Sequence, residues 1–214
     1  MPKITAIKVQ RKNRERVNIY LDGEFAFGLT RIVAGWLHTG QILDEKKIEA
    51  LRADDEREMA YIRALNYLSY RPRSIKEIER NLQKYKVPEI LIPEIIERLK
   101  KNNFVNDQEF AKLWIENRNT FRPRGKRALR LELRQKGIDN EEVQPILDEL
   151  VDEESLAYQA GIKKAKKLAN LEWQDFRRKL GAFLARRGFP YSVIGPLLRP
   201  LWDEVHPEDE AEPL

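Results

Sequence analysis

A basic segment in the middle of the chain has residue types and spacing that suit contact with a polyanion. Residues 118–136 include eight lysines and arginines, and Glu132 is the single acidic residue among them. With 3.6 residues per helical turn, Arg127, Arg130 and Arg134 fall on one side of a helix. Such a stripe suits phosphate groups, bound with a salt-dependent affinity, or an acidic protein surface. We therefore expect this segment to contact a partner.

The predicted partner-binding residues lie in this segment and in a related Arg-Pro-Arg turn earlier in the chain. They are Arg71, Arg73, Arg122, Arg124, Lys126, Arg127, Arg130 and Arg134. We expect the four arginines of this set between 124 and 134 to be exposed on one surface. The reason is that Leu129 and Leu133 occupy the inward side of the same helix.

A second basic cluster follows, with a weaker claim to function. Its members are Lys163, Lys164, Lys166, Lys167, Arg177, Arg178, Lys179, Arg186 and Arg187. The alternative for both clusters is a solvated helix face, the usual meaning of a charge run. No aromatic platform is interleaved with these cations as in single-strand binders, and we expect Tyr70 and Phe121 to pack in the core.

Residues suited to catalysis or to cofactor binding are missing from the pattern. The two histidines, His38 and His206, are isolated from carboxylates at metal-ligand spacing, and the chain has no cysteine. Gly23 to Gly28 belongs to a predicted hairpin and lacks the Lys-Ser/Thr and helix start of a phosphate loop. We therefore expect no catalytic, cofactor-binding or metal-binding residues and no enzyme activity.

Bulk composition indicates a cytoplasmic protein that does not enter a membrane. The chain lacks a run of about 18 apolar residues and an apolar signal segment at its start. Its net charge of +5 is uneven, because residues 203–214 hold six acidic residues and no basic one. The rest of the chain carries 40 basic and 29 acidic residues. No dimerisation element is evident, so we expect a monomer.

One apolar pattern occurs three times at a spacing of 51 residues. A shift of 51 carries Tyr70-Arg71-Pro72-Arg73 onto Phe121-Arg122-Pro123-Arg124, and the apolar positions that follow keep register without a gap. Leu82, Leu133 and Leu184 form one such set. A fixed period of this length is typical of a tandem array, in which each unit buries apolar surface against its neighbours. The pattern predicts three helices per repeat in an elongated, mainly α array.

The chain begins differently, with alternating residues that predict a small antiparallel β unit of three strands. Asp22-Gly23 is a type I′ hairpin dipeptide between the strand patterns of Val17–Leu21 and Phe25–Leu29. The predicted domains are a β unit at 1–30, linking helices at 31–55, repeats at 56–104, 105–152 and 153–202, and an acidic disordered tail at 203–214.

Local signals mark helix ends within the repeats. Ser74 to Glu77 form a capping box, and either Asn106 or Asp107 caps the next repeat's first helix. Gly137 and Gly188 share one repeat position, where a left-handed residue is expected, and Lys86 takes that position in the first repeat. Prolines 93, 145 and 196 predict third helices that begin late or bend, and a break is expected near Ala53-Asp54.

Three segments resemble the signature segments of the bacterial RecX family, regulators of the recombinase RecA. They are LSYRPRS at 68–74, FVNDQEFAKLWIENR at 104–118 and FRPRGKRALRLELRQKGI at 121–138. The resemblance covers residues 56–202 and is strongest in the second repeat, and the β-rich start resembles an extension that some members carry. In the third repeat Trp173-Gln174-Asp175 replaces the Arg-Pro-Arg.

The resemblance implies a curved array of three-helix repeats that binds the RecA–DNA filament. It implies blocked filament extension, reduced ATPase and strand exchange, and contact with single- or double-stranded DNA that is weak or confined to the filament. The residues alone indicate only a partner that is acidic and extended. A middle and a third helix joined by a short turn also resemble a helix-turn-helix, so a direct DNA-binding protein with a role in transcription or DNA architecture is the alternative.

Overall fold

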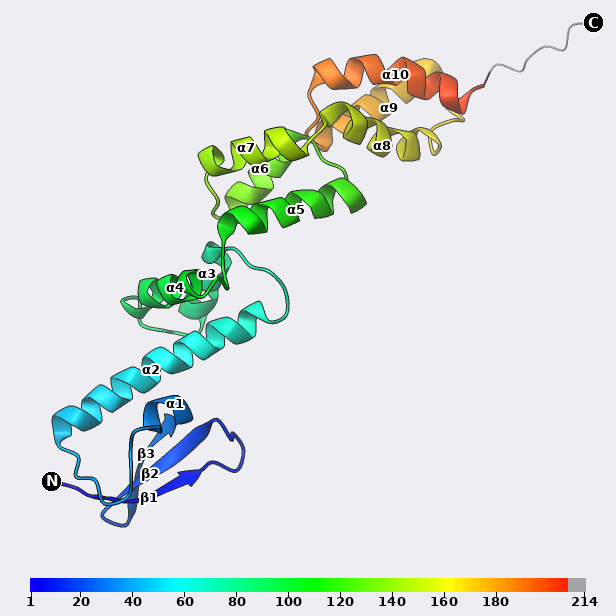
Figure 1. Cartoon of the computed structure of the whole chain (residues 1–214). Helices are drawn as coiled ribbons and strands as arrows, with labels where there is room; N and C mark the ends of the chain where they lie inside the picture. The colour runs from blue at the N-terminus through cyan, green and yellow to red at the C-terminus, as the bar shows by residue number, and fades with distance from the viewer. Residues whose placement is uncertain (208–214) are drawn as a thin grey trace, which may run out of the picture. The chain divides into compact units, whose positions relative to one another are not determined.

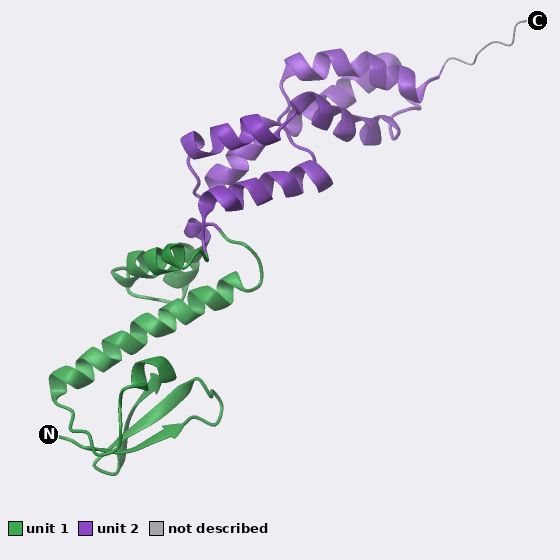
Figure 2. Cartoon of the chain, in the orientation of Figure 1, with its two compact units in different colours: residues 1–73, 78–104 green, residues 74–77, 105–214 purple. Residues whose placement is uncertain are grey.

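The computed structural model describes residues 1–207 of the chain, and most of them are helical. Three strands are followed by ten helices in this described part (Figure 1). The chain divides into two compact units (Figure 2). Unit 1 comprises residues 1–73 and 78–104, and unit 2 comprises residues 74–77 and the chain from 105 onward. The mainly α fold with a β start, predicted from the sequence, is confirmed.

The first element group of unit 1 is an antiparallel sheet with the order β1-β2-β3. Its strands are β1 (Ile4–Val9), β2 (Arg16–Leu21) and β3 (Glu24–Thr30). Asp22 and Gly23 join the last two strands with φ angles of 49° and 94°, the left-handed pair that a type I′ turn requires. Leu21 pairs with Glu24 across this turn, as the dipeptide predicted.

The sheet packs on helices of its own unit, because a three-stranded sheet alone buries too little apolar surface. Ile4, Ile19 and Leu29 are fully buried, together with Leu43 from the segment before α2. The buried carboxylate of Asp55, on α2, accepts the backbone N–H of Thr30 at 2.5 Å and the guanidinium of Arg16 at 2.9 Å. A polar contact therefore ties the end of β3 to α2.

Helix α2 (Glu45–Leu68) is continuous over 24 residues, and α1 (Arg31–Ala34) is a single turn. Asp44 caps α2 by accepting the N–H of Lys47 at 2.7 Å. The expected break near Ala53-Asp54 is wrong. Asp55 is bonded to Thr30 and Arg16 of the sheet and Asp54 pairs with Arg57 one turn on, so neither carboxylate competes for the backbone of its own helix.

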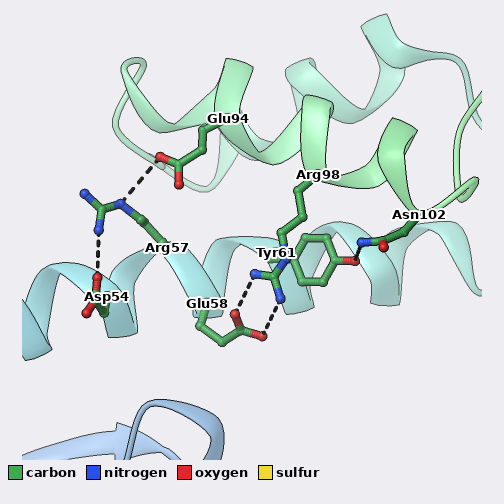
Figure 3. Close-up of polar contacts among 7 residues, drawn as sticks. All are labelled: Asp54, Arg57, Glu58, Tyr61, Glu94, Arg98 and Asn102. Atoms are coloured by element: carbon green, nitrogen blue, oxygen red, sulfur yellow. Dashed lines mark hydrogen bonds and ion pairs between the residues drawn. The ribbon is translucent and has the colours of Figure 1, made fainter.

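Polar contacts join α2 to α4 (Leu91–Lys101) in unit 1 (Figure 3). Arg98 donates to the buried carboxylate of Glu58 at 2.6 Å, and its guanidinium carbon lies 3.6 Å from the ring centre of Tyr61. Asn102 donates to the Tyr61 hydroxyl at 3.1 Å. Figure 3 also shows Arg57, which pairs with Asp54 on its own helix and with Glu94 on α4. Glu58 is thus buried with a cation held against it by an aromatic ring.

Unit 2 contains two three-helix repeats around one core. Its helices are α5 (Asp107–Phe121), α6 (Lys126–Gln135), α7 (Asn140–Leu150), α8 (Glu153–Ala165), α9 (Trp173–Arg186) and α10 (Tyr191–Val205). Helix α3 (Ile75–Lys84) begins in unit 2 and continues in unit 1. Trp114, Trp173 and Trp202 pack partly buried against this core.

The 51-residue register places equivalent side chains in equivalent environments. Leu82, Leu133 and Leu184 are all fully buried. So are Ile78, Leu129 and Leu180, one helical turn earlier in each middle helix. The prediction of three repeats with the same buried positions is confirmed.

The predicted capping residues act as expected. Ser74 and Glu77 exchange side-chain-to-backbone hydrogen bonds, each at 3.3 Å, and form the capping box. Asn106 caps α5 by accepting the N–H groups of Gln108 and Glu109. Asp107 caps the start of α3 instead, where it accepts the N–H of Ile75 at 2.9 Å.

Each middle helix ends in a left-handed residue at one repeat position. Gly137 and Gly188 have φ angles of 87° and 88°, and Lys86 has a φ of 58°. The N–H of the next residue reaches back to the helix in all three cases, as from Val87 to the Leu82 carbonyl at 3.1 Å. Lys86 therefore adopts the common turn with the strain that a side chain carries there.

Glycine turns also make close backbone contacts in unit 2. The N–H of Gly125, at the start of α6, donates to the Arg187 carbonyl at 3.0 Å. Fifty-one residues earlier, the Ser74 hydroxyl at the start of α3 donates to the Lys136 carbonyl at 2.7 Å. A methyl group on Gly188 would lie 2.5 Å from the Ala128 Cβ, so this approach requires glycine.

Three expectations about single residues are wrong. Tyr70 and Phe121 are 84% and 73% exposed and do not pack in the core. Helices α7 and α10 begin five residues before Pro145 and Pro196, so a late start is wrong for these two, whereas α4 begins two register positions later, at Leu91. Helix α10 runs to Val205 and includes two acids of the predicted tail; residues 208–214 lie outside the described part.

We predict that Lys86→Gly stabilises the protein by about 1 kcal/mol, because glycine relieves the left-handed strain. Denaturant unfolding followed by circular dichroism measures the change. Gly137→Ala is the matched control and should destabilise, since its methyl would lie 2.5 Å from the Lys76 Cβ. Equal stability of wild type and Lys86→Gly would contradict the strain.

The Glu58–Arg98 contact yields a second prediction. Arg98→Met should destabilise unit 1 by about 1–3 kcal/mol, because it leaves the buried Glu58 carboxylate without its cation. Adding Glu58→Gln should recover part of this loss, since a neutral amide needs no counter-charge. A double-mutant cycle on the free energy of unfolding measures the coupling. Strictly additive effects would show that the pair is not coupled.

Candidate functional site

Helix α6 presents the predicted basic stripe on the surface of unit 2. It begins after Gly125, and the first helical N–H, that of Lys126, donates to a Glu153 carboxylate oxygen at 2.8 Å. Leu129 and Leu133 are fully buried beneath the helix, as expected. The opposite side of α6 is thereby left to its charged residues.

Half of the eight basic residues in 118–136 have acidic partners inside the fold. The Glu132 carboxylate binds Arg118 at 2.8 Å and Arg124 at 2.7 Å, and it accepts the indole N–H of Trp114. Lys136 binds Glu77 at 2.8 Å. These charges stabilise the repeats, so the count of cations in the sequence overstates the charge offered to a partner.

Lys126 is also held internally, by Asp148 on α7 at 2.7 Å. Hydrogen bonds from Lys126 and then from Gln144 lower the pKa of Asp148, which keeps this carboxylate ionised. Of the predicted site residues, Arg124 and Lys126 therefore serve partly as structural contacts.

Four predicted site residues have no acidic partner within residues 1–207. They are Arg122, Arg127, Arg130 and Arg134. Arg127 and Arg134 are exposed, whereas Arg130 is half-buried and donates to the neutral Gln144 Oε1 at 2.5 Å. Arg124 is half-buried as well, so only part of the expected arginine set is fully exposed.

Three hollows that share lining residues lie on this surface, and we term them together the basic groove. The first is lined by Arg127, Arg130, Leu131, Arg134 and Asn140. The second shares Arg127 and Arg130 with it and extends to Tyr191, with a cavity of about 500 Å³. The third shares Tyr191 and continues along α9 and α10, where Arg177 and Arg178 line it. Of these two, Arg178 pairs with Asp175 on its own helix.

Tyr191 is the main feature of the groove that sequence reasoning missed. Its side chain is 78% exposed at the first position of α10, between the second and third hollows. The exposure of Tyr191 could have been predicted from the residues at its equivalent positions in the other repeats. A shift of 51 aligns Tyr191 with Asn140 and Glu89, both polar and exposed, so an aromatic residue at this position is at the surface.

Positive charge also gathers near Gly188, which lines the second hollow. Arg187 donates to the Pro123 carbonyl at 2.9 Å. Burial, followed by the neighbouring charges of Arg124 and Arg122, lowers the pKa of Arg187. Arg187 is thus half-buried, with the charges of two further arginines near it.

The first two predicted site residues belong to unit 1. Arg71 is exposed and donates to the Pro72 carbonyl at 3.2 Å. Arg73 is half-buried, with its guanidinium carbon 4.0 Å from the ring centre of Tyr67. Both lie beside an aromatic cavity of that unit, described below.

Other kinds of site find no support in the described residues. Within 1–207, no group of three or more histidines, aspartates or glutamates is arranged to hold a metal ion. No helix of that range has the length and apolar character needed to cross a membrane.

The fold defines a helical-repeat protein that has arginine-lined hollows on the surface of unit 2. Four family models match it in order: the regulatory protein RecX N-terminal domain at residues 2–44, and the first, second and third three-helix domains of RecX at 60–99, 106–145 and 152–197. The chain therefore belongs to the RecX family, which confirms the resemblance found in its sequence.

Individual relatives match over nearly the whole chain. The regulatory protein RecX of Bacillus pumilus is 34% identical over 220 residues, which cover 100% of this chain and 83% of that protein. The one from Bacillus velezensis is 36% identical and covers 99% and 81%. A crystal structure of regulatory protein RecX superposes with a TM-score of 0.77 at 29% identity, over 94% of this chain and 100% of that chain. The RecX structure from Lactobacillus salivarius has a TM-score of 0.62 at 30% identity, over 69% of this chain and 97% of that one.

The division between structural and free arginines predicts different effects of substitution. Arg124→Ala should lower the free energy of unfolding by about 1 kcal/mol, because it removes a cation from the half-buried Glu132. Arg127→Ala should leave stability within about 0.5 kcal/mol, the range for exposed surface positions. Thermal unfolding of both variants measures the contrast, and equal losses would refute this division of roles.

Proposed function

We propose that this chain regulates the RecA recombinase without catalysing a reaction. In this proposal it binds the RecA–DNA filament and inhibits filament extension, ATPase and strand exchange. Membership of a family whose relatives are named regulatory protein RecX supports a regulatory role. It acts as a monomer in the cytoplasm and needs no cofactor. DNA contact within the filament is weak.

The observation that carries the proposal is the basic groove with its unpaired arginines. Arg127, Arg134 and Arg177 line it without an acidic partner within residues 1–207. A row of such charges on rigid helices binds a row of phosphates or acidic side chains and reads no base sequence. Tyr191 adds a flat apolar surface midway along the row. This chemistry suits an extended filament better than a compact ligand.

Direct DNA reading by a helix-turn-helix, the alternative function, is disfavoured by charge. In that mode the first turn of the second helix enters the major groove between phosphates. Helix α7 opens with Glu141 and Glu142, and α4 has Glu94 in its first turn. Carboxylates at these positions repel phosphates. Among the third helices of the repeats in residues 1–207, α4 and α7 have an acid in the first turn and α10 has none, so a reading role for all three repeats is not supported.

The double variant Arg127→Gln/Arg134→Gln tests the proposal. RecA-type ATPase on single-stranded DNA should require more of this variant than of wild type for half-inhibition. The log–log salt slope of binding to the filament should fall by about two, one for each charge removed. Both side chains are exposed, so the thermal unfolding temperature should stay unchanged.

Lys166→Gln/Lys167→Gln is the matched control. It removes the same charge from exposed residues that line none of the three hollows, and it should inhibit like wild type. Equal inhibition by wild type and both double variants at moderate salt would refute the role of the groove. Absence of any effect of wild type on the ATPase would refute the proposed function itself.

A further inference from the structure

Unit 1 contains an open cavity of about 260 Å³ between α2 and α3 that no role described above uses. Tyrosine, asparagine and arginine predominate among its lining residues. They are Met59, Ile62, Arg63, Asn66, Tyr67, Tyr70, Asn81 and Tyr85. None of the eight is acidic, although 35% of the chain is charged. The lining therefore offers aromatic rings, amides and a guanidinium but no carboxylate.

Guanidinium groups lie over two of the tyrosine rings that line this cavity. The guanidinium carbon of Arg63 lies 4.0 Å from the ring centre of Tyr85, and that of Arg73 lies 4.0 Å from the ring centre of Tyr67. Tyr70 is 84% exposed and Tyr85 is 52% exposed. Folding thus leaves flat aromatic surfaces exposed to water beside positive charge. A planar ligand that stacked on these rings would bury them.

Two side-chain amides supply polar recognition at the same place. Asn66 and Asn81 line the cavity, and neither amide has a hydrogen-bond partner among residues 1–207. Each amide carries both donors and an acceptor. A ligand that satisfies them needs polar atoms on its edge as well as a flat face.

We propose that this cavity binds a base of single-stranded nucleic acid. A nucleobase has a flat face for the tyrosine rings, a polar edge for the asparagine amides, and a phosphate on either side for Arg63. In a single strand the bases are free to enter such a cavity, whereas in a duplex both face and edge are occupied. Stacking of this kind tolerates any base, so the site has no strong sequence preference.

A protein side chain fits the cavity less well. Phenylalanine or leucine would cover the tyrosine rings but leave both amides unsatisfied, which costs affinity. A carboxylate would pair with Arg63 but would not use the aromatic faces. The combination of rings, amides and cation matches a nucleotide more fully.

This inference goes beyond the proposed regulation of the recombinase, because it concerns a different unit and free single strands. Binding is therefore measured without any recombinase, on the full-length protein. The probe is fluorescein-labelled oligothymidylate of about 20 nucleotides, longer than common single-strand sites. A second probe of equal length carries abasic sugars and keeps the phosphates but lacks the bases.

Tyr70→Ala and the double variant Tyr70→Ala/Tyr85→Ala should weaken binding to oligothymidylate by about tenfold or more and leave binding to the abasic strand unchanged. Tyr70→Phe/Tyr85→Phe should bind like wild type, because the rings remain. Arg127→Gln/Arg134→Gln in the basic groove should weaken any binding to both probes equally, since it alters phosphate contacts alone. Tyr70 is so exposed that its single variant keeps the fold even if the double variant does not.

Three outcomes would overturn the proposal. Wild type could bind both probes equally, so that bases contribute nothing. The tyrosine variants could lose affinity for both probes alike, which would mean loss of phosphate contact or of structure. They could also bind oligothymidylate like wild type while losing inhibition of the recombinase, and the cavity would then hold a protein side chain.

Discussion

The contact on which unit 2 depends is the backbone approach of a glycine turn to the start of a preceding middle helix. The Arg187 carbonyl accepts the Gly125 N–H at 3.0 Å, and a methyl group on Gly188 would collide with Ala128. This contact fixes the beginning of α6 against the end of α9. Arg127 and Tyr191 follow within a few residues of the two partners and line the same hollow. A bulkier residue at 188 would separate them and divide the basic groove.

Carboxylates on α3, α6 and α7 decide which cations in and beside α6 are left without an ion pair. Asp148 on α7 and Glu77 on α3 neutralise Lys126 and Lys136, while Glu132 binds two arginines at once. What remains is a narrow row of arginines instead of a broad positive field. In a narrow row, each unpaired arginine adds directly to the affinity for a row of anions. The pairing of the other cations also limits repulsion between like charges, which would destabilise the helices.

The repeats could be predicted from the sequence because their signals are local or strictly periodic. The 51-residue register, the Asp22-Gly23 turn and the capping box of Ser74 each depend on neighbours in the chain, and each is confirmed. The charge partners of Arg124 and Lys126 were unpredictable, since they depend on which helices face each other. The exposure of Tyr70 has the same origin. Its aromatic side chain predicts a core position, but whether another element covers it depends on the tertiary packing, and Tyr70 is left exposed.

Equivalent positions of the register carry different chemistry on the same backbone. Position 89 is Glu, 140 is Asn and 191 is Tyr, and all three are exposed at the same step of the repeat. The buried residue at 82, 133 and 184 is leucine in every case, so the same core packing is compatible with different residues at the exposed register position. A tandem array can therefore acquire a stacking residue in one repeat and an amide in another without refolding. Tyr191 in unit 2 and the tyrosine cavity of unit 1 show how one architecture provides two chemically distinct surfaces along a single chain.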